Sequence, residues 1–181
     1  MSVLSVYHQN RPEQPLKVLT HHDDIAATLA EAEVRFEHLD ARAALAADAS
    51  PEEVLAAYRP QIDRLQAERD FASADVLRVT GNDRQQNELR ARFLEEHRHA
   101  EDEVRFIVAG RGLFSLRFGE LVYAVLCEKG DLLTVPAGIR HWLDMGENPH
   151  LVAIRLFRNS EGWSAEFTGD DIASRFPRLE D

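Results

Sequence analysis

The feature that most constrains the fold is a change in hydrophobic periodicity close to residue 97. Before that point apolar residues mostly recur at helical spacing, and after it apolar and polar residues alternate in short runs. Glycine, proline, asparagine or acidic turns bound these runs, a pattern typical of an antiparallel sandwich or small barrel. We therefore expect a mainly β protein with helices (α+β), in which helices from the N-terminal half pack outside a barrel.

The N-terminal half contains three amphipathic stretches that predict helices. Thr20 is the expected N-cap of the first, and Ser50 begins a capping box in the second. Pro60 interrupts the apolar stripe of the second stretch, so we expect a kink or break there. Leu89 and Phe93 share one face of the third. The stretches are 20–33, 50–70 and 82–96, and a strand is expected at 75–79.

The C-terminal half predicts five strands and a short helix that ends before Pro177. The expected strands lie within 103–119, 120–131, 132–138, 141–146 and 150–157. A chain of 181 residues fits one domain with a single sizeable core. We expect one domain, 1–181, made of a mainly helical portion (1–96), a barrel core (97–158) and a C-terminal segment (159–181).

The charge and the cysteine content limit the possible partners and compartment. The net charge is −11, with acidic and basic residues mixed along the chain, so a nucleic acid or an anionic membrane is not an expected partner. Cys127 is the single cysteine, which excludes an internal disulfide and suits a reducing compartment. The N-terminus lacks a signal-peptide pattern, and no stretch is apolar enough to span a bilayer. We expect a cytoplasmic protein.

The segment "EEHRHAEDEVRFIVAGRG" (95–112) contains candidate metal ligands. Side chains two apart on a strand project to the same face, so His97 and His99 point together. If the strand resumes after Asp102, Glu103 joins them and Arg105 follows on that face. Imidazoles and a carboxylate are natural ligands of a divalent cation. Taken alone, however, the histidine pair is equally well explained as a solvated strand end.

A second segment, "GDLLTVPAGIRHW" (130–142), favours the metal-site interpretation. Pro136 fixes φ and Gly138 permits a positive φ, so the turn between them has a defined shape that directs the following strand. His141 then comes from a neighbouring strand of the same barrel. The alternative for His141 is a core or rim histidine beside Trp142.

Together the two segments resemble the motifs of the cupin superfamily. The first motif is met by His97, His99, Glu103 and Gly110, and the second by Gly130, Pro136, Gly138 and His141. Two positions depart from the pattern, since Ala91 and Met145 stand where cupins usually have glycine and asparagine. Neither departure affects a ligand. The resemblance implies a cupin-type double-stranded β-helix (jelly-roll barrel) with His97, His99, Glu103 and His141 as metal ligands.

A closer resemblance is to the bacterial acireductone dioxygenases, and it spans nearly the whole chain. It rests on 95–114, "VLCEKGDLLTVPAG", "HWLDMG", "AIRLF" and 161–179. It implies an enzyme of methionine salvage that cleaves 1,2-dihydroxy-3-keto-5-methylthiopentene with O2. With Fe(II) the implied products are 4-methylthio-2-oxobutanoate and formate. With Ni(II) they are methylthiopropanoate, formate and CO. The ligand set accepts either metal, so the sequence leaves the metal open.

The resemblance also implies roles for residues around the metal. Arg105, on the face of the ligands, is expected to stabilise the enolate oxygens of the substrate, although a salt bridge to Asp102 or Glu101 is an alternative. Arg155 is a charge among apolar neighbours that needs a buried anion or partner, and by resemblance it lines the pocket. Phe93, Leu143 and Trp163 are expected to contact the methylthio tail, with core packing as the alternative for each.

Other functions remain open at this stage. One is a different metal-cupin enzyme, such as an isomerase or another small-molecule dioxygenase. Another is a non-catalytic cupin that binds a ligand, and a third is a purely structural barrel. The oligomeric state is not determined by the sequence, and we expect a monomer.

Overall fold

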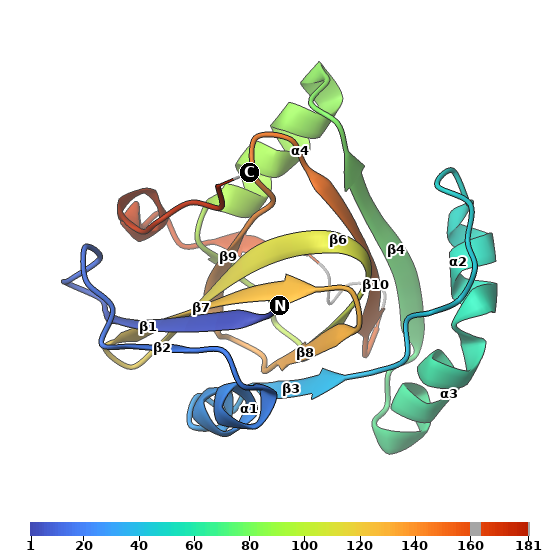
Figure 1. Cartoon of the computed structure of the whole chain (residues 1–181), viewed down its shortest axis with the longest axis horizontal. Coiled ribbons are helices and arrows are strands. Elements are labelled where there is room, and N and C mark those ends of the chain that lie inside the picture. The colour runs from blue at the N-terminus through green and yellow to red at the C-terminus, as the bar shows by residue number, and fades with distance from the viewer. Residues whose placement is uncertain (160–163, 181) are drawn as a thin grey trace.

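A computed structural model of the chain describes residues 1–159 and 164–180. Eleven strands form two antiparallel sheets that share the long strand β6 (Figure 1). The strands are β1 (Val3–His8), β2 (Lys17–Leu19), β3 (Arg35–His38), β4 (Ser73–Thr80), β5 (His97–Arg98), β6 (Glu103–Phe118), β7 (Leu121–Glu128), β8 (Asp131–Val135), β9 (Arg140–Asp144), β10 (His150–Phe157) and β11 (Glu166–Phe167). The helices are α1 (His22–Ala30), α2 (Pro51–Ala57), α3 (Arg59–Glu68), α4 (Arg84–Leu94) and the 3₁₀ helix η1 (Ile172–Arg175).

Strand β6 joins the two sheets because its two halves pair with different neighbours. Residues 103–110 pair with β10 and residues 103–106 also pair with β8, in a sheet of order β4-β10-β6-β8-β3. Residues 111–118 pair with β7 and residues 113–117 also pair with β9, in a sheet of order β11-β5-β9-β6-β7-β1-β2. The change occurs at Gly110, whose φ of 72° is accessible mainly to glycine. The result is the expected jelly-roll arrangement of the cupin type, built as a sandwich.

The alternation of side chains along the strands separates the core between the sheets from the outer faces. On β9, Leu143 points into the core between the sheets, whereas Trp142 packs outside against η1. On β6, Ile107 points inward and Phe106 outward, where Phe106 meets Tyr58, between α2 and α3, edge to face at 5.5 Å. Figure 1 shows α2 and α3 beside β4 and α4 at the opposite end of the molecule from α1.

All three helix predictions are confirmed, by α1, by α2 with α3, and by α4, and one predicted N-cap is wrong. Ser50 caps α2 in a capping box, and the chain breaks between α2 and α3 next to Pro60, as predicted. The prediction of Thr20 as N-cap of α1 is wrong. His21 occupies that position and makes no side-chain hydrogen bond to the helix. The predicted strand at 75–79 is β4, and the third helix is α4.

The N-terminal portion also supplies strands, which the prediction of a mainly helical segment did not include beyond β4. Strand β1 lies between β7 and β2, and β3 pairs with β8 at the edge of the other sheet. Residues 1–96 are thus part of both sheets as well as the helices outside them. Within residues 1–159 and 164–180, no helix is long and apolar enough to span a membrane.

Candidate metal centre

Three buried histidines converge at one end of the space between the sheets. His97 lies on β5 directly opposite His141 of β9, and His99 follows β5 by one residue. Their side chains are buried, and one ligand nitrogen from each lies within 4.8 Å of the others. The short β5–β9 pairing therefore brings together histidines that are more than forty residues apart in the sequence.

Backbone carbonyls fix the tautomer of each imidazole. In every case the Nδ1 atom contacts a carbonyl oxygen, which only accepts hydrogen bonds, so Nδ1 carries a proton and Nε2 is the nitrogen that a neutral ring offers to a metal ion. The pairs are His97 with the Glu95 carbonyl (2.7 Å), His141 with the Ile139 carbonyl (2.8 Å) and His99 with the Ser164 carbonyl (3.2 Å). Hydrogen bonds of this kind orient metal-ligating histidines and raise their basicity.

Glu103, the first residue of β6, places a carboxylate against two of these histidines. Its Oε2 lies 3.3 Å from His99 Nε2 and its Oε1 lies 3.4 Å from His141 Nε2. The same Oε2 accepts a hydrogen bond from Arg105 Nη2 at 3.3 Å. Burial opposes ionisation of Glu103, but the Arg105 charge and the adjacent histidines outweigh it and lower the pKa of this carboxyl. Glu103 is therefore ionised.

The protonation states and the unpaired nitrogens of the cluster fit a bound cation. Burial lowers the pKa of His97 to about 3, with the neighbouring His141 as the next cause, and burial also lowers the pKa of His99. The Nε2 atoms of His99 and His141 are buried and have no hydrogen-bond partner within the described part of the chain. Neutral imidazoles with free lone pairs beside an ionised carboxylate form a donor set suited to a divalent transition metal.

Two arginines lie beside this cluster. Arg105 and Arg155 face each other in the β6–β10 pairing, and their guanidinium carbons lie 5.8 and 5.5 Å from the centre of the Phe157 ring. Arg105 contacts Glu103 rather than Asp102 or Glu101, the alternatives that the sequence left open. Burial lowers the pKa of Arg105 and the Glu103 charge opposes this shift, although a guanidinium stays protonated at neutral pH.

Arg155 has the partner that its apolar sequence context required. Asp75 of β4 lies opposite it and accepts two hydrogen bonds, from Nε at 2.7 Å and from Nη2 at 2.6 Å. This bidentate geometry fixes the plane of the guanidinium. Asp75 was not predicted from the sequence as part of the site. An acidic residue inside a strand was visible, but the register that places it beside Arg155 was not.

A cavity of about 270 Å³ opens beside the histidines and the two arginines. Its walls come from β4, α4, β5, β6, β10 and the segment around β11. The lining residues are Leu77, Leu89, Arg92, Phe93, His97, His99, Arg105, Arg155, Ser164, Ala165 and Phe167. It combines arginines and two of the clustered histidines with apolar side chains, a lining that suits a small organic anion.

The predicted pocket residues fall into three groups. Phe93 lines the cavity, and its ring centre lies 6.4 Å from that of His97. Leu143 does not line this cavity. It is buried in the core between the sheets, where a Cβ on Gly112 would lie 3.0 Å from its Cδ1. Trp163 falls outside the described residues. Ala165 and Phe167, which also line the cavity, were not singled out from the sequence.

Comparison with known proteins agrees with this geometry. The ARD/ARD′ family matches residues 5–165. Proteins named acireductone dioxygenase from Stutzerimonas stutzeri (strain A1501) and Pseudomonas aeruginosa (strain UCBPP-PA14) are 67% and 65% identical over 181 residues, covering all of both chains. The structure of "Acireductone dioxygenase from Bacillus anthracis with cadmium ion in active center" superimposes with a TM-score of 0.81 at 27% identity, covering 92% of this chain and 98% of that one.

The family match covers most of the chain, and the sequence identity to the full-length relatives is far higher than chance would give. The structural match extends to a relative with a metal ion in its active centre. The resemblance stated from the sequence motifs is thereby confirmed: this chain belongs to the ARD/ARD′ family, the acireductone dioxygenases.

Proposed function

We propose that this chain is an acireductone dioxygenase that binds one divalent metal ion through His97, His99, Glu103 and His141. The observation that supports this most strongly is the convergence of the three buried imidazoles, with Glu103 against two of them. The names of the full-length relatives supply the reaction class. The proposed substrate is 1,2-dihydroxy-3-keto-5-methylthiopentene, with O2 as co-substrate.

A metal ion bound by this donor set would act as a Lewis acid toward neighbouring enol and keto oxygens of the substrate. Arg105 and Arg155 lie beside the same cavity, paired with Glu103 and Asp75, and the buried Arg105 Nη1 has no hydrogen-bond partner in the described residues, so it can donate to the ionised form of an enediol. Leu77, Leu89 and Phe93 offer apolar contacts for the methylthio tail. The residues of the chain thereby bind and orient an anion with an apolar end.

The finer part of this proposal concerns the metal and the products. Three imidazoles and a carboxylate accept Fe(II) or Ni(II) without strong discrimination. We propose that Fe(II) gives 4-methylthio-2-oxobutanoate and formate, as in methionine salvage, and that Ni(II) gives methylthiopropanoate, formate and CO. We also propose a cytoplasmic monomer. Support for the compartment comes from the cysteine content, because a single cysteine cannot form an internal disulfide and suits a reducing compartment.

The test is aerobic consumption of the acireductone by protein stripped of metal and reloaded with Fe(II) or with Ni(II), with analysis of all products including CO. We expect metal-dependent loss of substrate. His99→Ala should lose both bound metal and turnover, because loss of one of the four proposed ligands weakens metal binding and changes the geometry of the site. His8→Ala, which changes a histidine on β1 whose ring lies 3.7 Å from the Glu120 carboxylate, is the matched control.

Two results would contradict the proposal. If the substrate decayed no faster with either loaded protein than in buffer, the reaction would be wrong while the metal site could stand. If His99→Ala bound the metal ion with wild-type affinity, the ligand assignment would be wrong.

A further inference from the structure

Glu96 is a buried carboxylate that directly precedes the proposed ligand His97. It is 1% exposed, yet it is not among the residues that line the metal cavity. Successive side chains of an extended segment point to opposite sides, so Glu96 faces away from the cavity that His97 faces. A buried carboxylate costs free energy unless it is paired, which raises the question of what Glu96 binds and why.

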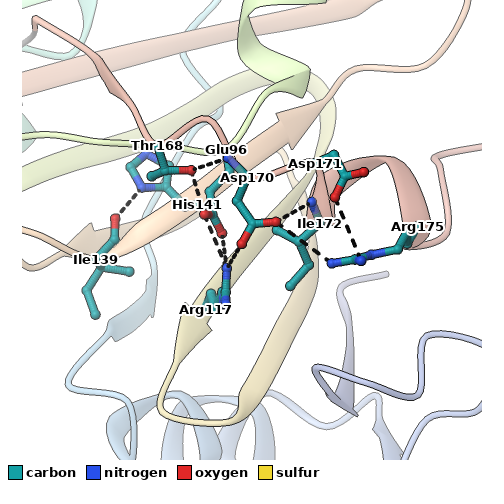
Figure 2. Close-up of polar contacts among 9 residues, drawn as sticks. All are labelled: Glu96, Arg117, Ile139, His141, Thr168, Asp170, Asp171, Ile172 and Arg175. Atoms are coloured by element: carbon teal, nitrogen blue, oxygen red, sulfur yellow. Dashed lines mark hydrogen bonds and ion pairs between the residues drawn. The ribbon is translucent and has the colours of Figure 1, made fainter.

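Glu96 binds Arg117 at the end of β6 and Thr168 just after β11 (Figure 2). Arg117 Nη1 donates to both carboxylate oxygens, at 3.3 and 3.2 Å, and Thr168 Oγ1 donates to Oε1 at 2.8 Å. The same Arg117 nitrogen donates to Asp170 Oδ2 at 3.0 Å. Arg117 thus links a residue next to a metal ligand with the segment that follows β11, and its hydrogen bond lowers the pKa of Asp170.

The segment linked in this way, residues 164–170, contributes directly to the metal centre. We call it the C-terminal strap. The Ser164 carbonyl accepts the hydrogen bond from His99 Nδ1, and Ala165 and Phe167 line the cavity. Phe167 lies opposite His97 in the β5–β11 pairing, with the two ring centres 6.0 Å apart. The position of the strap therefore determines the orientation of one proposed ligand and one wall of the cavity.

Other side-chain contacts of the strap are weak. Strand β11 has only two residues, and Phe167 is 41% exposed. The ion pair between Arg98 of β5 and Glu166 of β11 is exposed, and such pairs contribute little to stability. Side chains therefore hold the strap in place, upstream of η1, mainly through two partly buried contacts. These are the contact of Thr168 with Glu96 and the contact of Asp170 with Arg117.

We infer that Glu96, Arg117, Thr168 and Asp170 form a latch that positions the C-terminal strap over the metal centre, so that Ser164 orients His99 and Phe167 closes the cavity beside His97. These four are positioning residues, since none of them lines the cavity. The inference rests on the proposed function for its effect on substrate. Its effect on metal binding and on strap position does not depend on which substrate is used.

The test removes the latch contacts that the strap residues Thr168 and Asp170 supply. The double variant Thr168→Val and Asp170→Asn removes the hydroxyl and the charge that meet Glu96 and Arg117 but leaves the Glu96–Arg117 ion pair in place. The amide introduced at position 170 retains a carbonyl oxygen, which can still accept the hydrogen bond that the Ile172 N–H donates to Asp170 Oδ1 at the start of η1. The fold should therefore persist, and any change in the measured properties of the double variant would result from loss of the latch contacts.

Three quantities should change together. With both proteins free of metal, amide hydrogen exchange in peptides covering 164–170 should be about tenfold faster in the double variant than in wild type, because local opening becomes easier. The dissociation constant for Ni(II), measured by chelator competition, should rise about tenfold, as for loss of other groups that orient metal ligands. KM for the acireductone should rise more than kcat falls, because the cavity wall is displaced while the reacting groups remain.

Arg111→Met is the matched control, because Arg111 also lies on β6 and also bonds the C-terminal region, at the Glu180 carbonyl away from the metal. It should leave all three quantities within about twofold of wild type. Unchanged exchange in the strap of the double variant would overturn the inference. So would faster exchange with unchanged Ni(II) affinity, or an equal acceleration in β1 and β7, which would indicate general destabilisation instead of positioning.

Discussion

At the scale of single residues, the candidate metal centre depends on the contacts of the Glu103 carboxylate with its neighbours. Its carboxylate contacts two imidazoles and the buried Arg105 guanidinium. A carboxylate that also binds a cation needs Arg105 less for its own ionisation, because the cation supplies a stronger positive field. The Arg105 charge is then available for a substrate anion in the cavity, and the Nη1 atom of Arg105 is buried without a hydrogen-bond partner in the described structure.

This arrangement predicts the effect of Arg105→Met, which removes the charge but keeps a long, unbranched side chain. We expect kcat to fall about 10²- to 10³-fold, the usual cost of losing a donor to developing negative charge, while metal per chain stays at the wild-type value. Steady-state kinetics and elemental analysis measure the two quantities. Arg98→Met, which removes an exposed arginine between His97 and His99, should change kcat by less than about twofold. Wild-type turnover in Arg105→Met would remove Arg105 from the mechanism.

At the scale of the elements, the position of the proposed metal ligands depends on the bend where β6 passes from one sheet to the other. Gly110 lies at this bend with φ at 72°, and a Cβ built there would lie 1.7 Å from the His150 carbonyl oxygen of β10. Both the backbone conformation and the close approach of β10 therefore require glycine. Glu103 and Arg105 lie before the bend, and the β6 residue that pairs with His141 lies after it.

Gly110→Ala should therefore destabilise the protein by more than the backbone conformation alone. A positive φ costs a non-glycine residue about 1–2 kcal/mol, and the clash with β10 adds to this. Gly119→Ala is the matched control, because φ is 60° there and nothing lies within 4 Å of the added Cβ. Urea unfolding of the metal-free variants measures both costs. Equal destabilisation by the two substitutions would show that the β10 contact exerts no strain.

At the scale of the whole molecule, the sequence predicted what depends on local pattern and missed what depends on register. Alternation identified β6 to β10 but not the two-residue β11, and it gave the inward face of β9, on which both His141 and Leu143 lie. Alternation could not tell which inward-facing residue of the strand lies at the cavity and which lies in the core. Leu143 is two residues further along, roughly 7 Å, and this places it in the core instead of the cavity.

Side-chain pairings between distant segments could not be predicted from the sequence either. Asp75 meets Arg155 across 80 residues, and Glu96 meets Thr168 across 72, and each depends on the register of strands whose order only the fold defines. The histidines were an exception because their spacing within two motifs resembles a known superfamily. Periodicity alone left a solvated strand end as an equal alternative for His97 and His99.

The last prediction concerns the coupling of metal binding to the stability of the whole chain. The proposed ligands come from β5, the residue after it, β6 and β9, so an ion bound by them links segments that only the folded state brings together. Free metal at 100 times its dissociation constant should stabilise the fold by about 2.7 kcal/mol. For a chain of this length that corresponds to a rise in Tm of roughly 5–10 °C. Scanning calorimetry of stripped protein across a Ni(II) titration measures the rise. In His99→Ala the same titration should leave Tm nearly constant, and an equal rise in that variant would place the stabilising ion at another site.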